Sequence, residues 1–435
     1  MRVGIVGAGL SGLTLGYRLR NAGVETVTFE ATGEPGGVIR SRHDADGHIL
    51  ERGPQRTRLT PAVTDVVSSL GLEGELIEAA DPPLYVYRDG ELRRAPLSIR
   101  SALTTSLFSW RGKLRALGEP LAEPPRDDET VAEFFSRSFG PEVAENFLGP
   151  LYAGLYGSKP DEMPVQHSAA KAMTKSGPTD SVLLNVLRAK LRGKEPPAIG
   201  SFRDGLQTLP NALYEEQAES VHLDEPVRAI REAEDGYRLE STDRDVRVDR
   251  VVLATPAEAT ASLLASVAPD AARRIGQLTF NRLAVVHLHS EGNLHGSGFQ
   301  VPHDEPLATL GTTWNASLLD RDGVYTSYLG GSKNPDLLNW ADDRIAETAC
   351  REFEAVTGCA ATPLGVSRLE PGMPAYDHSW DALDGLELPD GIDLCTNYVA
   401  RAGIPGRVRA ATTLADELQQ ATDDAESVVA EPPSG

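Results

Sequence analysis

Residues 1–12 of the chain read MRVGIVGAGLSG, and residues 25–30 read ETVTFE, a segment that ends in an acid, Glu30. The apolar run at residues 3–6 predicts a short, buried parallel strand. Three glycines follow it in the spacing G-x-G-x-x-G, and residues 13–20 have the pattern of a helix with its apolar side inward. A second strand is expected over ETVTF. The stretch therefore predicts a strand, a glycine turn, a helix and a strand that ends in an acid.

This order of elements is typical of a dinucleotide-binding site. Gly7 permits the tight turn, Gly9 lets a pyrophosphate approach the backbone, and Gly12 allows close packing of helix on strand. The helix N-terminus supplies free N–H groups and the positive end of a dipole, and Glu30 is placed to bind a ribose hydroxyl. A purely structural glycine-rich turn is the alternative, but it does not explain the acid in register.

A second glycine pair follows in GGVIRS at residues 36–41. In flavoproteins with this fold, a Gly-Gly followed by a basic residue continues the cofactor cradle along the pyrophosphate, and here Arg40 can offset phosphate charge. Gly-Gly alone marks only a turn. Its position after the first fingerprint favours FAD over NAD.

Length and charge limit the function classes. At 435 residues the chain is expected to form two or three domains. A formal charge of −22, from 64 acids and 42 bases, argues against nucleic acid as a partner and against strong binding to anionic membranes. Only seven of the bases are Lys, and an acid excess with few Lys also fits adaptation to high salt.

The cysteines, Cys350, Cys359 and Cys395, form no metal-ligand pair and are too few for a disulfide framework. The nine histidines show neither a metal-ligand nor a triad pattern, so no metal site is expected. No signal peptide precedes the first strand, and no uncharged apolar run approaches the length of a membrane span. We therefore expect a soluble cytoplasmic protein.

The later parts of the chain contain several further motifs, with residues 98–191 mostly helical in pattern and residues 281–331 patterned as an antiparallel sheet. The motifs are ERGP at 51–54, GLQTL at 205–209, GFQVP at 298–302, LGTTWNAS at 310–317, LGGSKNP at 329–335, and Asn397-Tyr398 with Gly403-Ile404-Pro405. With the two glycine motifs, the chain resembles the protoporphyrinogen oxidase family of the FAD-dependent, amine-oxidase-like superfamily over nearly its full length.

The resemblance implies an α/β composite fold with a Rossmann-like FAD-binding domain assembled from discontinuous segments. We expect that domain at 1–80, 200–256 and 376–420. A helical insertion that lines the active site is expected at 81–199, and a substrate-binding domain with an antiparallel sheet at 257–375. The residues 421–435 are expected to form an acidic flexible tail.

The resemblance also assigns the cofactor-binding residues. It implies the pyrophosphate at residues 7–12, the adenine near Val227, and the flavin half of FAD near residues 37–38, 53–54 and 403–405. The complete set is Gly7, Ala8, Gly9, Leu10, Ser11, Gly12, Glu30, Ala31, Gly37, Val38, Arg40, Gly53, Pro54, Val227, Gly403, Ile404 and Pro405.

For the substrate, the resemblance points to Arg100 in APLSIR at residues 95–100 as the residue that holds a propionate, because an arginine fork donates two parallel hydrogen bonds to a carboxylate. The alternative is a surface arginine, one of 35 in the chain. Members of the family often dock on membranes through the helical domain, and residues 103–110 are the apolar patch that could make a weak peripheral contact here.

Three positions depart from the family pattern. Gln55 follows Gly-Pro where the family usually has arginine, although Arg56 and Arg58 stand close by. Ala375 replaces a glutamine, and Cys395 stands in the segment before Asn397 where the family has Gly-Asn. These positions concern the surroundings of cofactor and substrate.

The activity implied is oxidation of protoporphyrinogen IX to protoporphyrin IX in haem biosynthesis, with O2 as acceptor and hydride transfer to flavin N5. Aromatisation drives the reaction, so no general base or other catalytic side chain is expected. Coproporphyrinogen III is an alternative substrate. An amine oxidase, for which Lys333 is the only suitable lysine, or a carotenoid desaturase is an alternative within the superfamily. A non-catalytic flavin-binding partner in tetrapyrrole handling is an alternative of another class.

Overall fold

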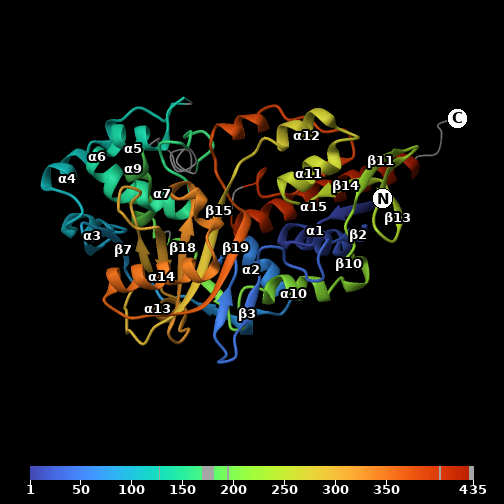
Figure 1. The fold of residues 1–435 in the computed structure, drawn as a ribbon. Coiled ribbons are helices and arrows are strands. Elements are labelled where there is room, and N and C mark those ends of the chain that lie inside the picture. The colour runs from blue at the N-terminus through green and yellow to red at the C-terminus, as the bar shows by residue number, and fades with distance from the viewer. Residues whose placement is uncertain (127, 169–180, 194, 401–402, 431–435) are drawn as a thin grey trace.

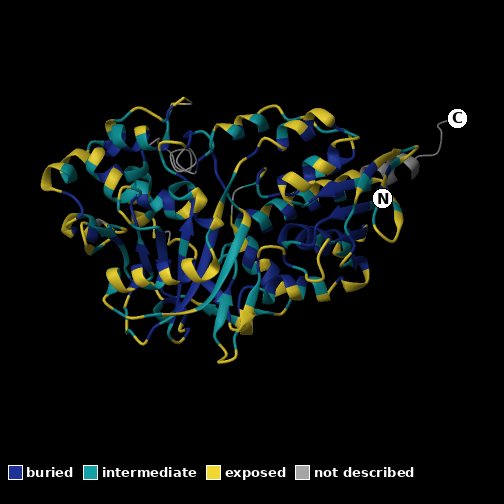
Figure 2. Ribbon diagram, viewed as in Figure 1, coloured by how far each residue is buried: buried dark blue, intermediate teal, exposed yellow. Residues whose placement is uncertain are grey.

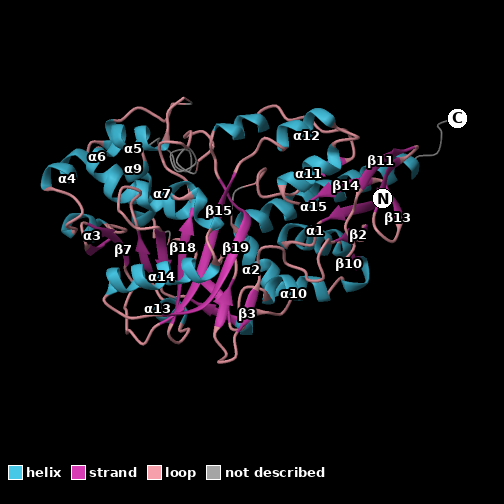
Figure 3. Cartoon of the chain, in the orientation of Figure 1, coloured by secondary structure: helices cyan, strands magenta, loops and turns pink. Residues whose placement is uncertain are grey.

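The computed structural model describes residues 1–126, 128–168, 181–193, 195–400 and 403–430. Two β-sheet regions organise the chain, a parallel sheet on the right of Figure 1 and a larger sheet on the left, with a group of helices above the larger sheet. Figure 3 separates these strands from the helices that cover them. The mixture of sheets and helices confirms the expected α/β composite.

The parallel sheet contains both strands of the opening stretch. Its order is β10-β2-β1-β14-β20, and all of its pairs are parallel. The strands are β1 (Arg2–Val6), β2 (Glu25–Phe29), β10 (Val221–His222), β14 (Arg250–Leu253) and β20 (Ile392–Leu394). Segments from the beginning, the middle and the end of the chain therefore form one sheet, as expected for a discontinuous nucleotide-binding domain.

Helices and a small sheet cover this parallel sheet. On one side, α1 (Leu10–Asn21) and α15 (Ile404–Ala430) pack with the strands around Ile5, Leu15 and Val252. On the other side lies the three-stranded sheet β11 (Ala229–Ala233), β12 (Gly236–Glu240) and β13 (Asp245–Val248), followed by α11 (Ala257–Leu264) and α12 (Pro269–Ile275).

The larger sheet has seven strands in the order β19-β15-β18-β17-β16-β7-β8. They are β7 (Leu84–Arg88), β8 (Glu91–Arg94), β15 (Phe280–His289), β16 (Gly298–Gln300), β17 (Thr309–Thr313), β18 (Val324–Gly330) and β19 (Thr362–Pro374). Every pair is antiparallel except β16 with β7. Helix α14 (Asp342–Thr357) packs on one face, and Figure 2 shows the strands beneath it mostly buried.

The hairpin of β7 and β8 belongs to this sheet, whereas the sequence grouped it with the helical insertion that was expected to begin at residue 81. That boundary is wrong for the hairpin, because β7 pairs in parallel with β16, more than two hundred residues along the chain. The remainder of the three-domain division stays a prediction.

The expected helical stretch forms a separate group of short helices, with a core that includes Phe134, Phe135 and Tyr152. Its helices are α3 (Ile99–Thr104), α4 (Trp110–Ala116), α5 (Val131–Phe139), α6 (Pro141–Val143), α7 (Gly149–Tyr156) and α9 (Val182–Leu191), with η2 (Glu119–Leu121) and η3 (Ala144–Leu148) between them. Across the described part of the chain, none of the helices is both long and apolar enough to cross a membrane.

Short elements connect these bodies. They are β3 (Ser41–His43), β4 (Ile49–Glu51), β5 (Thr57–Arg58), β6 (Leu76–Glu78), β9 (Ile199–Phe202), α2 (Pro61–Ser69), α10 (Thr208–Glu215), η4 (Ala218–Ser220), α13 (Asn315–Leu319), η5 (Gly331–Lys333), η6 (Pro335–Asn339), η7 (His378–Leu383) and η1 (Glu73–Glu75). The β5, β9 and β6 strands form a small three-stranded sheet.

The end of the chain differs from expectation. Residues 421–435 were expected to form a flexible tail, but the last helix, α15, continues to Ala430. The segment after Leu418 contains no Gly or Pro before residue 431, so nothing in it stops the helix. Within the expected tail, residues 421–430 are therefore helical, and residues 431–435 lie outside the described part.

Candidate active site and cofactor cradle

The first glycine loop lies between β1 and α1 and fits an approaching anion. Gly7 has a φ of +105°, and a Cβ on Gly12 would collide with the carbonyl oxygen of Gly7, so both positions require glycine. Gly9 is the N-cap of α1 and provides no side-chain cap, which leaves the first N–H groups of the helix, including those of Leu10 and Ser11, open to a ligand.

Glu30 lies directly beside this loop. The Ala8 N–H donates to its Oε2 at 2.8 Å, and the Thr32 N–H donates to its Oε1 at 3.0 Å. These bonds hold the carboxylate at the carboxyl end of the parallel strands, where a ribose hydroxyl would be bound. Ala31 is exposed next to it, and half-buried Val227 follows Glu225, whose N–H donates to the Glu30 carbonyl at 2.8 Å.

The second glycine loop meets the first one backbone to backbone. The Gly36 N–H donates to the Ala8 carbonyl at 2.8 Å, and a Cβ on Gly37, where φ is +62°, would lie 3.3 Å from the Cα of Gly9. Val38 is exposed, and its carbonyl oxygen lies against Gly53. The structure thus places the predicted residues of the two glycine loops and of the ERGP motif, with half-buried Pro54 next in the chain, along one narrow path.

Arg40 holds the second loop. Its guanidinium forms an ion pair with Glu34 and donates from Nε to the Gly37 carbonyl at 3.0 Å and from Nη2 to Thr32 Oγ1 at 3.3 Å. The charge of Arg40 is thereby shared with Glu34. In this arrangement Arg40 shapes the cradle through the loop, and a direct phosphate contact stays a prediction.

The N-terminus of α15 brings a third segment to the cradle. Gly403 has a φ of +91° and is exposed, Ile404 is buried, and Pro405 stands in the first helical turn. In the same turn, burial lowers the pKa of Arg407 to about 10, and its Nη1 is buried with no hydrogen-bond partner among the described residues. A buried donor without an acceptor fits a site that is completed by a polar ligand.

Cys395, one of the three departures, lies near this turn. Burial raises the pKa of its thiol to about 11, opposed by Arg407 and by a hydrogen bond with Ser11. The side chain packs in the core between the parallel sheet and α15. Cys395 therefore links the end of β20 to the first glycine loop.

These features fit an extended dinucleotide. Two helix N-termini, two backbone-to-backbone glycine loops and a fixed acid line one path, and a Cβ at Gly37 would enter the space between the loops. The seventeen positions that the sequence assigned to the cofactor lie at these loops and segments or adjoin them. The contacts of each residue with a cofactor remain predictions.

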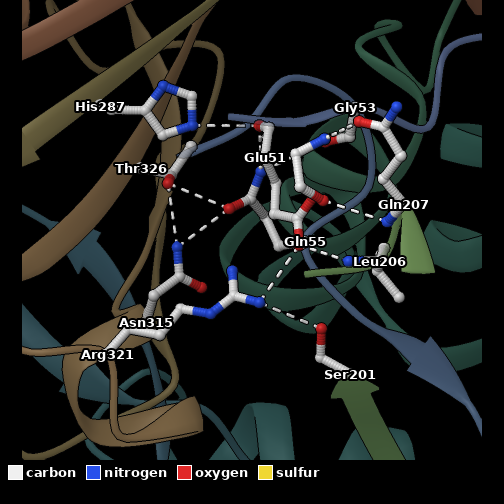
Figure 4. A network of polar contacts seen from close by, with 11 residues as sticks. Glu51, Gly53, Gln55, Ser201, Leu206, Gln207, His287, Asn315, Arg321 and Thr326 are labelled. Carbon is white, nitrogen blue, oxygen red and sulfur yellow. Dashed lines mark hydrogen bonds and ion pairs between the residues drawn. The ribbon is translucent and has the colours of Figure 1, made fainter. Parts of the chain in front are cut away.

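A buried polar network joins the cofactor side to the seven-stranded sheet (Figure 4). Glu51 is almost wholly buried; its Oε2 accepts from Ser41 Oγ at 2.6 Å, and its Oε1 accepts from the Leu206 N–H at 2.8 Å and from Arg321 Nη2 at 3.1 Å. Burial raises the pKa of Glu51, and Arg321 opposes that shift. Arg321 also donates to Ser201 Oγ at 3.1 Å.

Gln55 extends this network. Its Nε2 donates to the Glu51 carbonyl at 2.9 Å, and its Oε1 accepts from Asn315 Nδ2 at 2.9 Å and from Thr326 Oγ1 at 3.1 Å. Where the family usually has an arginine, this chain thus has a buried connector to α13 and β18. The sequence did not identify Arg321 or Asn315, although Asn315 stands in the LGTTWNAS motif.

His287 adds the contact from β15. Its Nε2 lies 3.0 Å from the Glu51 carbonyl, so that nitrogen carries the hydrogen and donates. Burial lowers the pKa of His287 to about 4, and the ring is therefore neutral near pH 7. His287 acts here as a structural donor.

The register of β18 shows which face of the large sheet meets this network. Tyr325 and Leu329 pack toward α14, whereas Thr326 and Tyr328, which alternate with them, lie on the opposite face. Tyr328 is half-buried, and burial raises the pKa of its hydroxyl to about 12, opposed by nearby Arg56, Thr313 and Gln55. This face lies against residues 51–56, a segment that includes Gly53 and Pro54, which the resemblance places beside the flavin half.

Two other predicted positions lie elsewhere. Arg100 is exposed in the first turn of α3, and no described contact joins its guanidinium to the network around Glu51. Ala375 is buried, and its carbonyl accepts from Ser158 Oγ at 2.7 Å, which ties the sheet to the segment after α7. The departure at Ala375 therefore lies at a joint between bodies of the fold.

Lys333, considered for an amine oxidase, lies on the α14 side. Its Nζ donates to the Pro302 carbonyl at 3.0 Å, and burial lowers its pKa to about 8. Trp340, Arg344 and Glu352 line the same cavity, which has a volume of about 660 Å³. Lys333 is thus separated by the sheet from the face that carries Tyr328.

Among the described residues, one group of side chains brings potential metal ligands close together. Asp44, Asp46 and His48 bring one ligand atom each within 4.8 Å of the others on the turn between β3 and β4. The Asp44 carboxylate already accepts from His48 Nδ1 at 2.7 Å and from the Asp46 and His48 N–H groups. These bonds explain the group as a stabilised turn.

The family model and the relatives that the chain matches agree on one family. Residues 10–416 match the family model described as flavin containing amine oxidoreductase. Protoporphyrinogen oxidase 1, chloroplastic, of Spinacia oleracea is 28% identical, over 96% of this chain and 85% of that protein. Protoporphyrinogen oxidase of Bos taurus is 31% identical, over 75% of this chain and 77% of that protein.

Solved structures share the fold. A protein of Exiguobacterium sp. 255-15, provisionally named a protoporphyrinogen oxidase, superposes with a TM-score of 0.80 at 22% identity, covering 96% of this chain and 98% of that one. Wild-type putrescine oxidase bound to putrescine gives a TM-score of 0.67 at 16% identity, covering 96% and 99%. At these identities the two structures support the architecture alone.

Proposed function

Because the chain belongs to the flavin-containing amine oxidoreductases and, among them, to the protoporphyrinogen oxidase family, we propose that it oxidises protoporphyrinogen IX to protoporphyrin IX with O2 as electron acceptor. The chain is an FAD-dependent oxidoreductase. When bound, FAD supplies a hydride acceptor at N5 that molecular oxygen can reoxidise. This reaction would give the protein a role in haem biosynthesis.

The observation that carries the proposal is the chemistry of the sheet face beside residues 51–56. Tyr328, Thr313 and Arg56 offer hydrogen-bond donors and a cation there. His287, which lies on that face, is neutral and donates to the Glu51 carbonyl. A reaction that is driven by aromatisation needs positioning and charge rather than a general base, and this face fits that need.

The roles of the chain's own residues follow from their contacts. Glu51, Arg321 and Gln55 fix the segment that carries Gly53 and Pro54 against the sheet, which keeps the predicted flavin half in a constant position relative to the substrate. A pKa of about 12 keeps Tyr328 protonated, so its hydroxyl stays a donor. The N-terminus of α15 would favour negative charge that develops nearby.

The position of Lys333 weighs against the amine oxidase alternative, since the lysine lies on the α14 side of the sheet. Coproporphyrinogen III remains an alternative substrate, and a carotenoid desaturase an alternative activity. A non-catalytic flavin-binding partner in tetrapyrrole handling remains the alternative of another class. An assay of porphyrinogen oxidation distinguishes these alternatives.

The test uses the purified holoprotein under air with protoporphyrinogen IX and with coproporphyrinogen III, each followed by porphyrin fluorescence. We expect faster growth of fluorescence with protoporphyrinogen IX than in a matched sample without protein, together with consumption of oxygen. Preference for coproporphyrinogen III would correct the substrate. Growth at the spontaneous rate with FAD bound would refute the oxidase and leave the non-catalytic flavoprotein.

We also propose a cytoplasmic protein with weak peripheral contact at the inner face of the membrane, through a patch on α3, α4 and η2. Of the expected segment 103–110, Leu107 and Phe108 are buried, so these two do not contribute. The exposed apolar side chains are Leu103, Trp110, Leu114, Leu117 and Leu121, and the basic ones among them are Arg111, Lys113 and Arg115. Amphipathic basic surfaces bind anionic lipid.

Flotation of the full chain with phosphatidylglycerol-containing vesicles tests the contact. We expect partial co-flotation that falls with salt. The variant Trp110→Ser with Leu114→Ser should reduce it, and equal flotation of this variant and the wild type would refute the patch.

A further inference from the structure

Arg56 lies in a segment that is fixed on both sides. The preceding residue, Gln55, is buried and hydrogen-bonded to Asn315 and Thr326, and the following residue, Thr57, is buried and pairs with Gly200 of β9. The backbone of Arg56 therefore cannot swing away from the sheet. Arg56 itself is half-buried, next in the chain to Gln55 of the network in Figure 4.

The guanidinium of Arg56 lacks a counter-charge. Among the described residues it makes no hydrogen bond and no ion pair, and burial lowers its pKa. The charged or ionisable groups that act on it are the Tyr328 hydroxyl and a second cation, Arg58. Arg321, also buried, has the Glu51 carboxylate at 3.1 Å. Arg56 is half-buried, so its charge is partly withdrawn from water, and the described residues place no anion beside it.

Glu51 is not that partner, because its carboxylate accepts from Ser41, from the Leu206 N–H and from Arg321, and it makes no described contact with Arg56. The phosphates of FAD are predicted at residues 7–12, at the N-terminus of α1, whereas Arg56 lies beside Tyr328 on the face of the large sheet. The missing anion is thus expected from a molecule that is bound over this face.

The groups around Arg56 select the class of anion. Tyr328 keeps its proton, with a pKa of about 12, and Thr313 adds a second hydroxyl from the neighbouring strand β17. A guanidinium beside neutral hydroxyls matches a carboxylate, which accepts two parallel bonds from an arginine fork. A porphyrinogen carries such carboxylates on its propionate groups.

We propose that Arg56 binds a propionate carboxylate of the macrocycle, so that the substrate is anchored from the sheet side rather than by Arg100. This inference rests on the proposed function for the identity of the substrate. Arg56 is then a binding residue that orients one side of the macrocycle over the flavin half. Arg100, exposed on α3, is not needed for this contact.

The test compares the binding of two ligands, with and without carboxylates, by the wild type and by an Arg56 variant. It measures binding and does not depend on turnover. Holoprotein is titrated with protoporphyrin IX and with its dimethyl ester, which lacks both carboxylates, in the same mild detergent, and binding is followed by quenching of porphyrin and flavin fluorescence. The wild type should bind the acid at least about tenfold more tightly than the ester, as expected for a charge-assisted hydrogen bond. Arg56→Gln should bind both ligands equally.

Matched variants separate this role from a structural one. Arg58→Gln removes a charge from the same segment, where the exposed Arg58 donates to the Pro197 carbonyl, and should keep the preference for the acid. Arg100→Gln should also keep it. Arg56→Lys retains the charge without the fork and should keep part of the preference. FAD content should match the wild type in every variant, and no variant should have a markedly lower thermal midpoint.

The outcomes distinguish this inference from the proposed function. A preference for the acid that survives in Arg56→Gln, or that is lost in Arg100→Gln alone, overturns the role of Arg56 even if the protein oxidises porphyrinogens. A preference that is lost in Arg56→Gln supports the role, whether or not the oxidation is observed. If Arg56→Gln does not fold, an undiminished preference in Arg56→Lys with Tyr328→Phe overturns it.

Discussion

Replacement of Arg321 by methionine tests the buried joint between the cofactor side and the sheet. The substitution removes the cation from Glu51, which is 1% exposed, and leaves a buried carboxylate without its ion-pair partner. Loss of one partner of a buried pair costs about 3–5 kcal/mol. At roughly 2 °C per kcal/mol for a chain of this size, the thermal midpoint should fall by about 6–10 °C.

The fall in the thermal midpoint of Arg321→Met should depend on pH. Burial raises the folded-state pKa of Glu51 above its value in the unfolded chain, so protonation favours the folded state, and stability from this group is lost as the pH rises through the folded-state pKa. Without Arg321 that pKa rises further. The thermal midpoint of Arg321→Met should therefore lie far below that of the wild type at pH 8 and closer to it at pH 5. Thermal unfolding with FAD in excess measures both midpoints.

Two control variants separate the effect of the buried charge pair from other effects of the substitution. The double variant Glu51→Gln/Arg321→Met removes both charges and should recover most of the lost stability. Arg282→Met breaks an ion pair with Glu370 in which both side chains are about two-fifths exposed, and should cost less than ~1 kcal/mol. An equal deficit at both pH values, or no recovery in the double variant, would show that Arg321 stabilises the fold without charge pairing.

Three further predictions concern the cradle and the surface. Gly37→Ala should lower FAD content sharply with little change in the far-ultraviolet spectrum, because the new Cβ would lie 3.3 Å from Gly9 Cα at a φ of +62°; full FAD content in the purified variant would contradict the loop geometry. Cys395, with a pKa of about 11, should react with iodoacetamide at pH 8 more slowly in the folded than in the unfolded protein, as mass spectrometry can measure. Dialysis from molar to millimolar KCl should lower the thermal midpoint, because a charge of −22 is then less screened; an unchanged midpoint and unchanged activity would exclude adaptation to high salt.

The sequence predicted the parts of the fold that depend on local pattern. The strand, glycine turn, helix and strand up to Glu30 form as expected, because each is set by apolar periodicity and by glycines that only one backbone path accommodates. The sequence did not predict that the hairpin of β7 and β8 belongs to the large sheet. The pairing of β7 with β16 is non-local, and nothing in the hairpin itself encodes its partner.

The same limit applies to the site. The motif at 51–54 was identified, yet its main partner, Arg321, comes from a turn after α13 that has no motif of its own. Gln55 was read as a departure from a family pattern, whereas in the structure its Nε2 donates to the Glu51 carbonyl of its own segment and its Oε1 accepts from Asn315 across the boundary. Arg100 was favoured by position in the sequence, but position did not report that its side chain is exposed.

The order of strands in the parallel sheet has a consequence for biosynthesis. On a ribosome, β1 can pair with β2 early, but its other edge, from Val3 to Val6, waits for β14, and β14 waits for β20 at residues 392–394. Until then an apolar strand presents unpaired backbone groups, which is a template for association with other nascent chains. A chain truncated before β20 lacks the last strand of this sheet and the N-terminus of α15, so the cradle is complete only when these segments have been synthesised. The net charge of −22 disfavours contact between such incomplete chains.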